Sequence, residues 1–316
     1  MKLLILGAGA VGGYLGAHLA RAGRDVTFLV RERRAAQLKQ RGLFVASPLG
    51  DVRTEVAAVT NAASLQPDVV LLACKAYDLG SALGAIAPAV GASTVIVPLL
   101  NGIAHLDIVA ARFRSATVWG GLVHLGVTLG PHGDIRHLNR LSILQFGPRG
   151  GASDSRSHEL ARLFAGTPVA ADARESIEQD LWNKFVFLTT LAGATCLMRC
   201  DVGTVMATPD GERLIQRLLE EATAIATAEG FAPDPSQLET YRQQLTQAGS
   251  SSKASMLRDV ERGSRTECEH VLGDMLARSR RHGLKAPVLE IATTHVRAYE
   301  IAWAQSQQLT ARGGPT

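Results

Sequence analysis

The chain has 316 residues, enough to bury two hydrophobic cores, so we expect two domains. Hydrophobic residues make up 46% of it and charged residues 20%, the balance of an ordinary water-soluble globular protein. The 33 basic and 29 acidic residues give a net charge of +4, a small and scattered excess that argues against a nucleic-acid partner and suits small anionic ligands.

The sequence predicts neither a membrane span nor a metal site. The longest segment without a charged residue, 79–106, is interrupted by Pro88, Gly91 and Pro98, which divide it into a helix, a strand and a turn. The four cysteines, at positions 74, 196, 200 and 268, have neither a C-x-x-C pair nor zinc-ligand spacing. We therefore expect reduced thiols and a cytoplasmic protein without membrane contacts.

A glycine-rich motif follows the first predicted strand, residues 2–6, and opens a predicted helix that ends at Gly23. Its G-x-G-x-x-G spacing allows a tight turn, a close approach of backbone N–H groups to a pyrophosphate, and packing of the helix on the strand. The predicted cofactor-binding residues of this motif are Gly7, Ala8, Gly9, Ala10, Val11 and Gly12.

The alternative for this segment is a secretory signal peptide, because it combines Lys2, an apolar stretch and small residues. A second strand at residues 25–30 follows the helix at once, as a βαβ unit requires. The apolar region of a signal peptide would also not contain so many glycines. We therefore expect a dinucleotide-binding domain.

The residues after the second strand indicate which dinucleotide is bound. An acidic residue there would bind the ribose 2′-hydroxyl of NAD, whereas an arginine accommodates the 2′-phosphate of NADP. No carboxylate follows the strand directly, but Arg31 does, with Arg33 and Arg34 close behind. We expect NADP, with Arg31 as the phosphate clamp and Arg33 or Arg34 as its assistant; the alternative is a solvated, charge-rich helix start.

Strands and helices alternate through the rest of the first domain, which we place at residues 1–171. We expect a hairpin within 42–60, strands at 68–75 and 94–98, and a helix at 77–87, which together indicate a doubly wound parallel sheet. Strand-like runs between 119 and 147, broken by the turn residues 130–133, should complete the sheet as antiparallel or edge strands.

Two polar side chains follow strands of this sheet. Lys75 ends the strand at 68–75 and Asn101 follows the strand at 94–98. The carboxyl ends of parallel strands face the ligand crevice of such folds, so both are candidate binding residues; the alternative for each is a solvated turn.

The second domain, 172–305, is predicted to be entirely helical, with helices at 177–199, 211–228, 255–282 and 287–304, and residues 306–316 as a flexible tail. Lys184 enters a helix that carries no further charge before Arg199. Such a lysine either snorkels at the wet end of a core helix or serves as an ammonium in a cleft. On their own, Ser255 indicates a helix N-cap and Glu267 a surface carboxylate.

Taken together, these segments resemble the ketopantoate reductase (2-dehydropantoate 2-reductase) family over essentially the whole chain. The matching segments are Gly7–Gly12, Arg31, Lys75, Asn101, the turn 130–135, residues 145–147, Trp182 with Lys184, Ser255–Asp259, and Thr266–Glu267. The resemblance implies a Rossmann-type domain followed by a helical domain like the C-terminal one of 6-phosphogluconate dehydrogenase, a small-molecule substrate, and a homodimer.

The resemblance also implies roles for the site residues. Lys184 is the expected catalytic acid, and Glu267 is an active-site carboxylate that orients it or binds the cofactor ribose. Asn101 and Lys75 line the nicotinamide side, and Ser255, Asn101 and Lys184 bind substrate. The expected reaction is NADPH-dependent reduction of a 2-oxo acid, foremost 2-dehydropantoate to pantoate in pantothenate and coenzyme A biosynthesis, with closure of the two domains excluding water.

Three positions depart from the family pattern. Leu188, Ala192 and Val202 stand where typical members carry asparagines that help hold the substrate. Losing three such donors should change substrate selection. The alternatives are therefore a sister reductase for a more apolar oxo acid, a β-hydroxyacid dehydrogenase with a different arrangement of its glycines and lysine, and a non-catalytic NADP-binding sensor.

Overall fold

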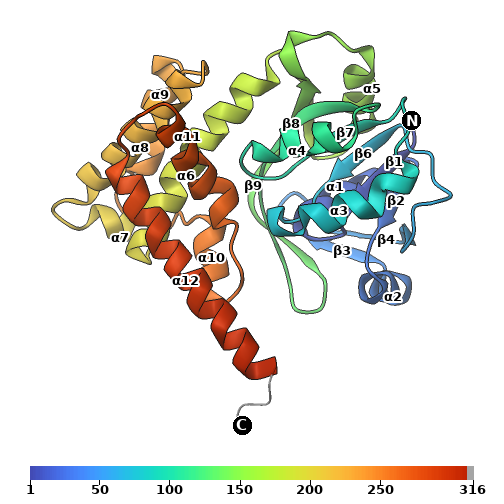
Figure 1. Ribbon diagram of the computed structural model, residues 1–316. Coiled ribbons are helices and arrows are strands. Elements are labelled where there is room, and N and C mark those ends of the chain that lie inside the picture. The colour runs from blue at the N-terminus through green and yellow to red at the C-terminus, as the bar shows by residue number, and fades with distance from the viewer. Residues whose placement is uncertain (312–316) are drawn as a thin grey trace. The chain divides into compact units, whose positions relative to one another are not determined.

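The computed structural model describes residues 1–311, which divide into two compact units: Met1–Glu178, and the described residues from Gln179 onward (Figure 1). The predicted boundary at 171/172 falls inside strand β10 (Ala170–Ala173), which pairs in parallel with β9 (Ile135–Pro148). This alanine-rich strand has no β-branched residue, so a continuation of the sheet past residue 171 could not be predicted from its composition.

The first unit contains the predicted parallel sheet, with strand order β7-β6-β1-β2-β5. The strands are β1 (Leu3–Leu6), β2 (Val26–Leu29), β5 (Ala57–Val59), β6 (Val69–Leu72) and β7 (Val95–Pro98). Leu3 and Ile5 belong to the core on one face of this sheet, and Leu4 and Leu6 to the core on the other. Both faces are covered, which explains why these strands are continuously apolar.

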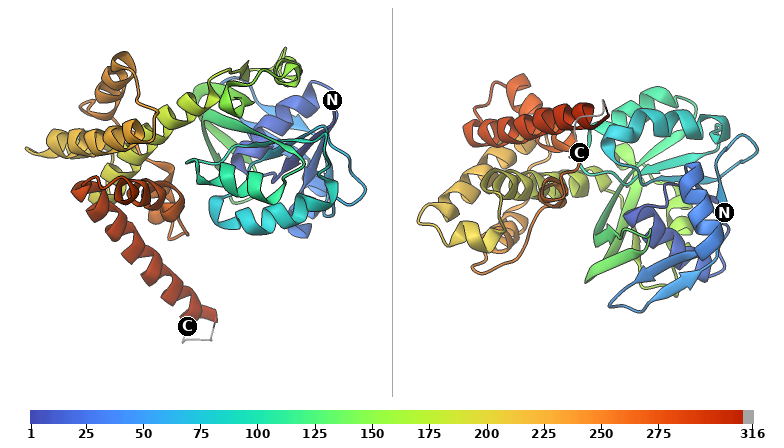
Figure 2. Two further views of the ribbon diagram at one scale, coloured as in Figure 1. Left: turned by 45° about the horizontal axis from the view of Figure 1, so that its top comes forward. Right: turned by 90° about the horizontal axis from the view of Figure 1, so that it is seen from below.

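Helices supply the other half of each core (Figures 1 and 2). The helix α1 (Ala10–Arg21) packs on the face of Leu3, whereas α3 (Leu79–Ile86) and α4 (Ala104–Arg112) pack on the face of Leu4. The remaining helical segments of this unit are α2 (Glu32–Arg41), η1 (Ala76–Asp78), η2 (Ala87–Ala89), η3 (Arg149–Gly151) and α5 (Ser155–Leu163).

Long antiparallel strands complete the sheet, as the sequence predicted. β8 (Thr117–Leu129) pairs with β7 in parallel and with β9 in antiparallel fashion. The turn between them is the expected glycine-containing one, in which the N–H of Gly130 donates to the carbonyl of Asp134 at 2.7 Å. The predicted hairpin is β3 (Leu43–Ala46) with β4 (Val52–Thr54), but β5 leaves it to extend the parallel sheet beside β2.

The second unit is helical. Its elements are α6 (Ile177–Met198, which starts at the end of the first unit), α7 (Val202–Met206), α8 (Gly211–Ala228), α9 (Pro235–Leu245), α10 (Ser255–Glu261), η4 (Glu269–Gly273), α11 (Asp274–Arg281) and α12 (Pro287–Ala311). Within residues 1–311, α6 alone is long and apolar enough to cross a membrane by length and composition, and 67% of its most apolar window is buried inside the fold, as in a core helix.

Two predictions for this unit were wrong in detail. The single helix expected at 255–282 is broken after α10, where Gly263 adopts φ of +62° and its N–H bonds the carbonyl of Val260. The tail expected from residue 306 is helical as far as Ala311, and its last residues, 312–316, lie outside the described part of the chain.

A buried histidine in the first unit predicts acid sensitivity. His18 of α1 is 4% exposed and packs edge-on against Tyr14, and its Nε2 has no hydrogen-bond partner among the described residues. Burial, with smaller contributions from the charges of His137 and Arg21, lowers the pKa of His18 to about 4. The unfolded chain therefore binds the proton first, so stability is lost as pH falls from the unfolded pKa of about 6.5 toward 4.

We expect the first unit to lose about 2 kcal/mol of stability between pH 7 and pH 5 through this histidine. Thermal melting of the His18→Leu variant should show a smaller loss of Tm over this interval than the wild type. The exposed His158→Leu variant is the control and should keep the wild-type slope. Equal slopes for His18→Leu and the wild type would show that His18 does not cause the acid sensitivity.

Candidate active site

The glycine motif forms a turn between β1 and α1 whose shape depends on two of its glycines. Gly7 has φ of +95°, a conformation that favours glycine, and its N–H donates to the carbonyl of Leu29 at 3.0 Å. A side chain at Gly12 would collide with the carbonyl oxygen of Gly7 and come within 2.9 Å of the Cβ of Ala73. These contacts seat α1 against the end of β1.

The same turn leaves room for a ligand. A Cβ built on Gly9 meets no atom within 4 Å, and Gly9 is the N-cap of α1 without a capping side-chain bond. Ala10 and Val11, the first residues of the helix, are half-buried, and no acidic side chain lies in the first turn. Backbone N–H groups at the positive end of a helix are suited to bind a pyrophosphate.

The sheet register brings the other predicted residues of this unit to one edge. Leu6 of β1 is level with Leu29 of β2 and with Leu72 of β6, and Leu72 is level with Pro98 of β7. The residues that follow these four strands therefore share the carboxyl edge of the sheet, where ligands bind in such folds. They include Gly7, Arg31, Lys75 and Asn101.

The arginines after β2 differ in their surroundings. Arg31 is the N-cap residue of α2, its side chain is 79% exposed, and its Nη2 lies 3.1 Å from Oδ1 of Asp78. Arg34 is half-buried and donates from Nε to the carbonyl of Ala8 and from Nη2 to that of Gly133, each at 3.0 Å. Arg34 thus connects the glycine turn to the β8–β9 turn, a bracing role that the sequence did not reveal.

Lys75 and Asn101 both lie half-buried in short connections. Lys75 is the N-cap residue of η1 and lies three residues beyond Leu72, the last residue of β6, rather than at the end of the strand as predicted. Asn101 follows the buried Leu100 and precedes Gly102, whose φ of +78° turns the chain into α4. Each lies three residues after a buried strand of the parallel sheet, so both are at its carboxyl edge.

In the second unit, Lys184 and Glu267 are close enough to interact electrostatically. Lys184 is partly buried on α6, and desolvation lowers its pKa to about 8, while the negative charge of Glu267 acts in the opposite direction. A lysine with a pKa this close to neutrality is suited to donate and accept a proton. These two residues were predicted as catalytic from separate segments of the chain.

Hydrogen bonds hold the chain in place both before and after Glu267. The N–H and Oγ1 of the buried Thr266 both donate to Oε1 of Glu300 on α12, at 2.7 and 2.6 Å. The carbonyl of Glu267 accepts the N–H groups of His270 and Val271, each at 3.1 Å, at the start of the π-helical η4. The role of Glu300 could not be predicted from the sequence, because nothing in the pattern of α12 distinguishes it from other surface carboxylates.

Ser255 has a different local role from the one that the sequence alone indicated. The N-cap of α10 is Ala254, and Ser255 is the first residue of the helix, with an exposed side chain and no capping bond. The N–H of Ala254 donates to Oγ1 of Thr195 on α6 at 3.4 Å, which connects the start of α10 to the helix of Lys184. Ser255 is therefore available for a ligand rather than used for capping.

The three positions that depart from the family pattern are apolar in their packing as well. Leu188 is half-buried, one turn after Lys184 on α6, and Ala192 is buried one turn further on. Val202 is buried at the start of α7, where its N–H donates to the carbonyl of Ser252, close to Ser255 in the chain. These side chains replace hydrogen-bonding groups with apolar surface.

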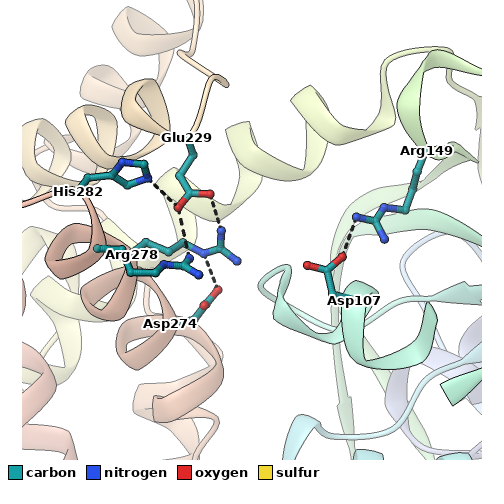
Figure 3. Close-up of polar contacts among 7 residues, drawn as sticks. Asp107, Arg149, Glu229, Asp274, Arg278 and His282 are labelled. Carbon is teal, nitrogen blue, oxygen red and sulfur yellow. Dashed lines mark hydrogen bonds and ion pairs between the residues drawn. The ribbon is translucent and has the colours of Figure 1, made fainter. Parts of the chain in front are cut away.

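Charged side chains of the second unit form a network around Arg278 (Figure 3). The guanidinium of Arg278 lies 5.1 Å from the centre of the Trp182 ring, two residues before Lys184. Its Nη1 is 2.7 Å from Glu229 and its Nε 3.0 Å from Asp274, and Glu229 also accepts from His282. In the first unit, a separate pair joins Arg149 to Asp107 at 2.8 Å.

We expect Arg278→Met to lower the free energy of unfolding of the second unit by about 3 kcal/mol. The change takes the ion-pair partner from Asp274, which is 15% exposed, and leaves Glu229 with only Arg281 and His282. Arg280→Met is the matched control, since it removes an exposed ion pair with Glu290 and should cost less than about 1 kcal/mol. Chemical denaturation followed by circular dichroism measures both, and similar midpoints for the two variants would contradict the importance of this network.

Comparisons with known proteins agree with this architecture. The family model described as ketopantoate reductase PanE/ApbA matches residues 3–151, and that of the PanE/ApbA C-terminal domain matches residues 176–300. An uncharacterized oxidoreductase of Bacillus subtilis, YkpB, is 36% identical over 300 residues, which cover 95% of this chain and 99% of YkpB.

Two further relatives carry more specific names. The 2-dehydropantoate 2-reductase of Halobacterium salinarum is 28% identical over 300 residues, which cover 94% of this chain and 98% of that protein. The crystal structure of a PanE/ApbA family ketopantoate reductase from Ralstonia eutropha superposes with a TM-score of 0.86 at 26% identity, covering 96% of this chain and all of the other. The chain belongs to the ketopantoate reductase family and is an oxidoreductase.

Proposed function

We propose that the protein is a cytoplasmic reductase that uses NADPH to convert a 2-oxo acid into the 2-hydroxy acid. The observation that carries this proposal is the burial of Lys184 on the apolar helix α6. Burial lowers its pKa to about 8, against the opposing effect of the Glu267 charge, and a lysine with this pKa is a suitable proton donor. The glycine turn of the first unit would bind the dinucleotide that supplies the hydride.

The residues of the first unit fit a phosphorylated dinucleotide. The open space at Gly9 and the uncapped start of α1 suit the pyrophosphate, and the exposed guanidinium of Arg31 suits a 2′-phosphate. Lys75 and Asn101, at the ends of the next strands, would line the nicotinamide side. When bound, NADPH supplies the hydride that reduces the substrate carbonyl carbon.

Lys184 supplies the proton in this proposal. As hydride adds to the carbonyl carbon, negative charge develops on the oxygen, and the ammonium of Lys184 stabilises this charge and donates a proton to it. Burial lowers the pKa of Lys184 and the charge of Glu267 partly opposes this shift; the resulting pKa of about 8 means that most molecules carry the proton at pH 7. Glu267 keeps the donor charged in the resting enzyme.

The substrate candidates differ in polarity. The relatives from Halobacterium salinarum and Ralstonia eutropha, which are named as 2-dehydropantoate 2-reductase and ketopantoate reductase, favour 2-dehydropantoate. Ser255 and Asn101 would help to position this substrate. The apolar side chains of Leu188, Ala192 and Val202 favour instead a 2-oxo acid with a more hydrophobic substituent. Both candidates keep the carboxylate next to the reacting carbonyl, and a cationic Lys184 suits both.

The test is a panel of 2-oxo acids, 2-dehydropantoate among them, assayed by the loss of NADPH absorbance. A low, saturating KM for 2-dehydropantoate would identify it as the substrate, and a lower KM for a branched or aromatic 2-oxo acid would favour the sister reductase. Tight binding of NADPH without turnover of any carbonyl compound would contradict the proposal and indicate a sensor.

A further inference from the structure

A carboxylate lies next to the proposed phosphate clamp, although none follows β2 in the sequence. Nη2 of Arg31 is 3.1 Å from Oδ1 of Asp78, a residue 47 positions later in the chain. The Arg31 side chain is 79% exposed and that of Asp78 is 38% exposed. Solvent therefore reaches this ion pair, and another anion can take the place of either carboxylate oxygen.

The sheet explains why these two residues meet. β2 and β6 flank β1 on either side, and their registers place Leu29 and Leu72 level with Leu6. Arg31 follows β2, and Asp78 is the last residue of η1, which follows β6. The ion pair therefore joins the two connections on either side of the glycine turn.

This place in a dinucleotide-binding fold decides between the two nicotinamide cofactors. An arginine after the second strand accommodates a 2′-phosphate, whereas a carboxylate there accepts a hydrogen bond from a 2′-hydroxyl. The folded protein has both groups within reach of each other, whereas the sequence around β2 shows the arginine alone.

We propose that Asp78 determines cofactor selectivity: its carboxylate competes with the 2′-phosphate of NADPH for Arg31 and accepts a hydrogen bond from the 2′-hydroxyl of NADH. This inference rests on the proposed function, because it requires a nicotinamide dinucleotide on the glycine turn. Bound NADPH must displace Asp78 from Arg31 and leave two negative groups close together. Bound NADH meets no such repulsion. Asp78 therefore reduces the preference in binding affinity for NADPH over NADH that Arg31 provides.

The test compares dissociation constants of NADPH and NADH, measured by nicotinamide fluorescence for wild type and Asp78→Asn. We expect Asp78→Asn to bind NADPH about five- to tenfold more tightly, the size of effect that removing one nearby like charge produces in a solvated site. NADH should bind about two- to fivefold more weakly, because the carboxylate acceptor is lost. The gain for NADPH should shrink at high salt.

Two further variants make the result specific. Asp172→Asn removes another exposed aspartate that pairs with an arginine, Arg174 at 3.2 Å, on the far strand β10, and should change neither dissociation constant. In an Arg31→Gln background, Asp78→Asn should improve NADPH binding by no more than about twofold, because the competition for Arg31 is gone.

Several results would overturn the inference. They are an unchanged or weaker affinity of Asp78→Asn for NADPH, an equal gain for both cofactors, or an effect of Asp172→Asn of the same size. A wild-type protein that binds neither cofactor would contradict the proposed function itself, and with it this inference, so the two failures are distinguishable.

Discussion

Replacing Lys184 with alanine should lower kcat at least about a hundredfold, while the dissociation constant of NADPH should stay within about twofold of the wild-type value. The reason is that Lys184 is the proposed donor to the developing alkoxide, whereas the glycine turn and Arg31, which bind the cofactor, belong to the other unit. Steady-state kinetics with the preferred 2-oxo acid and fluorescence titration with NADPH measure the two quantities separately.

Two variants exclude trivial causes of this loss. Lys184→Met keeps most of the side-chain volume and lacks the ammonium, so it should lose as much activity as Lys184→Ala. Lys285→Ala removes an exposed lysine before α12 and should retain full activity. Full activity of either Lys184 variant would refute its role as the proton donor.

Replacing Gly12 or Gly9 with alanine adds one methyl group to the glycine turn, and we expect the first change to affect mainly stability and the second mainly NADPH binding. Gly12→Ala forces a Cβ against the carbonyl oxygen of Gly7 and the side chains of Ala73 and Ile5, so we expect it to destabilise the first unit by about 3 kcal/mol. Gly9→Ala meets no atom within 4 Å at an ordinary φ of −78°, so the fold should lose less than about 1 kcal/mol.

For cofactor binding by the folded protein, Gly9→Ala should have the larger effect of the two substitutions. The free space at Gly9 is where backbone N–H groups would approach the pyrophosphate, so Gly9→Ala should weaken NADPH binding at least about tenfold while Tm is unchanged. Thermal melting and fluorescence titration of both variants check this. Unchanged NADPH affinity of a folded Gly9→Ala protein would show that the turn does not hold the cofactor.

The sequence predicted well those elements of the first unit whose structure is determined by neighbouring residues. The apolar run of β1, the glycines after it and the second strand are each recognisable from neighbouring residues, and the structure has all of them. β10 was missed because Ala170–Ala173 has no strand-forming composition, and its pairing with β9 is set by residues far away in the chain. Long-range pairing of this kind leaves no local signal.

The same limit explains what was missed around the candidate site. The sequence did not distinguish Arg33 from Arg34 as the assistant of Arg31, and only the fold shows that Arg34 bonds the carbonyl of Ala8 while Arg31 pairs with Asp78. Glu300 bonds the backbone of Thr266 across 34 positions, and the break after α10 interrupts a helical periodicity that continues through it. Partners that meet through tertiary structure cannot be predicted from spacing along the chain.

The pH dependence of kcat/KM for the preferred 2-oxo acid tests the account most directly, because it reports the ionisation of the free enzyme. Burial lowers the pKa of Lys184 to about 8, so an essential ammonium predicts that kcat/KM falls as pH rises through about 8. The small residual activity of Lys184→Ala should lack this decline. A wild-type profile that stays flat well above pH 8, or a decline that persists in Lys184→Ala, would contradict it.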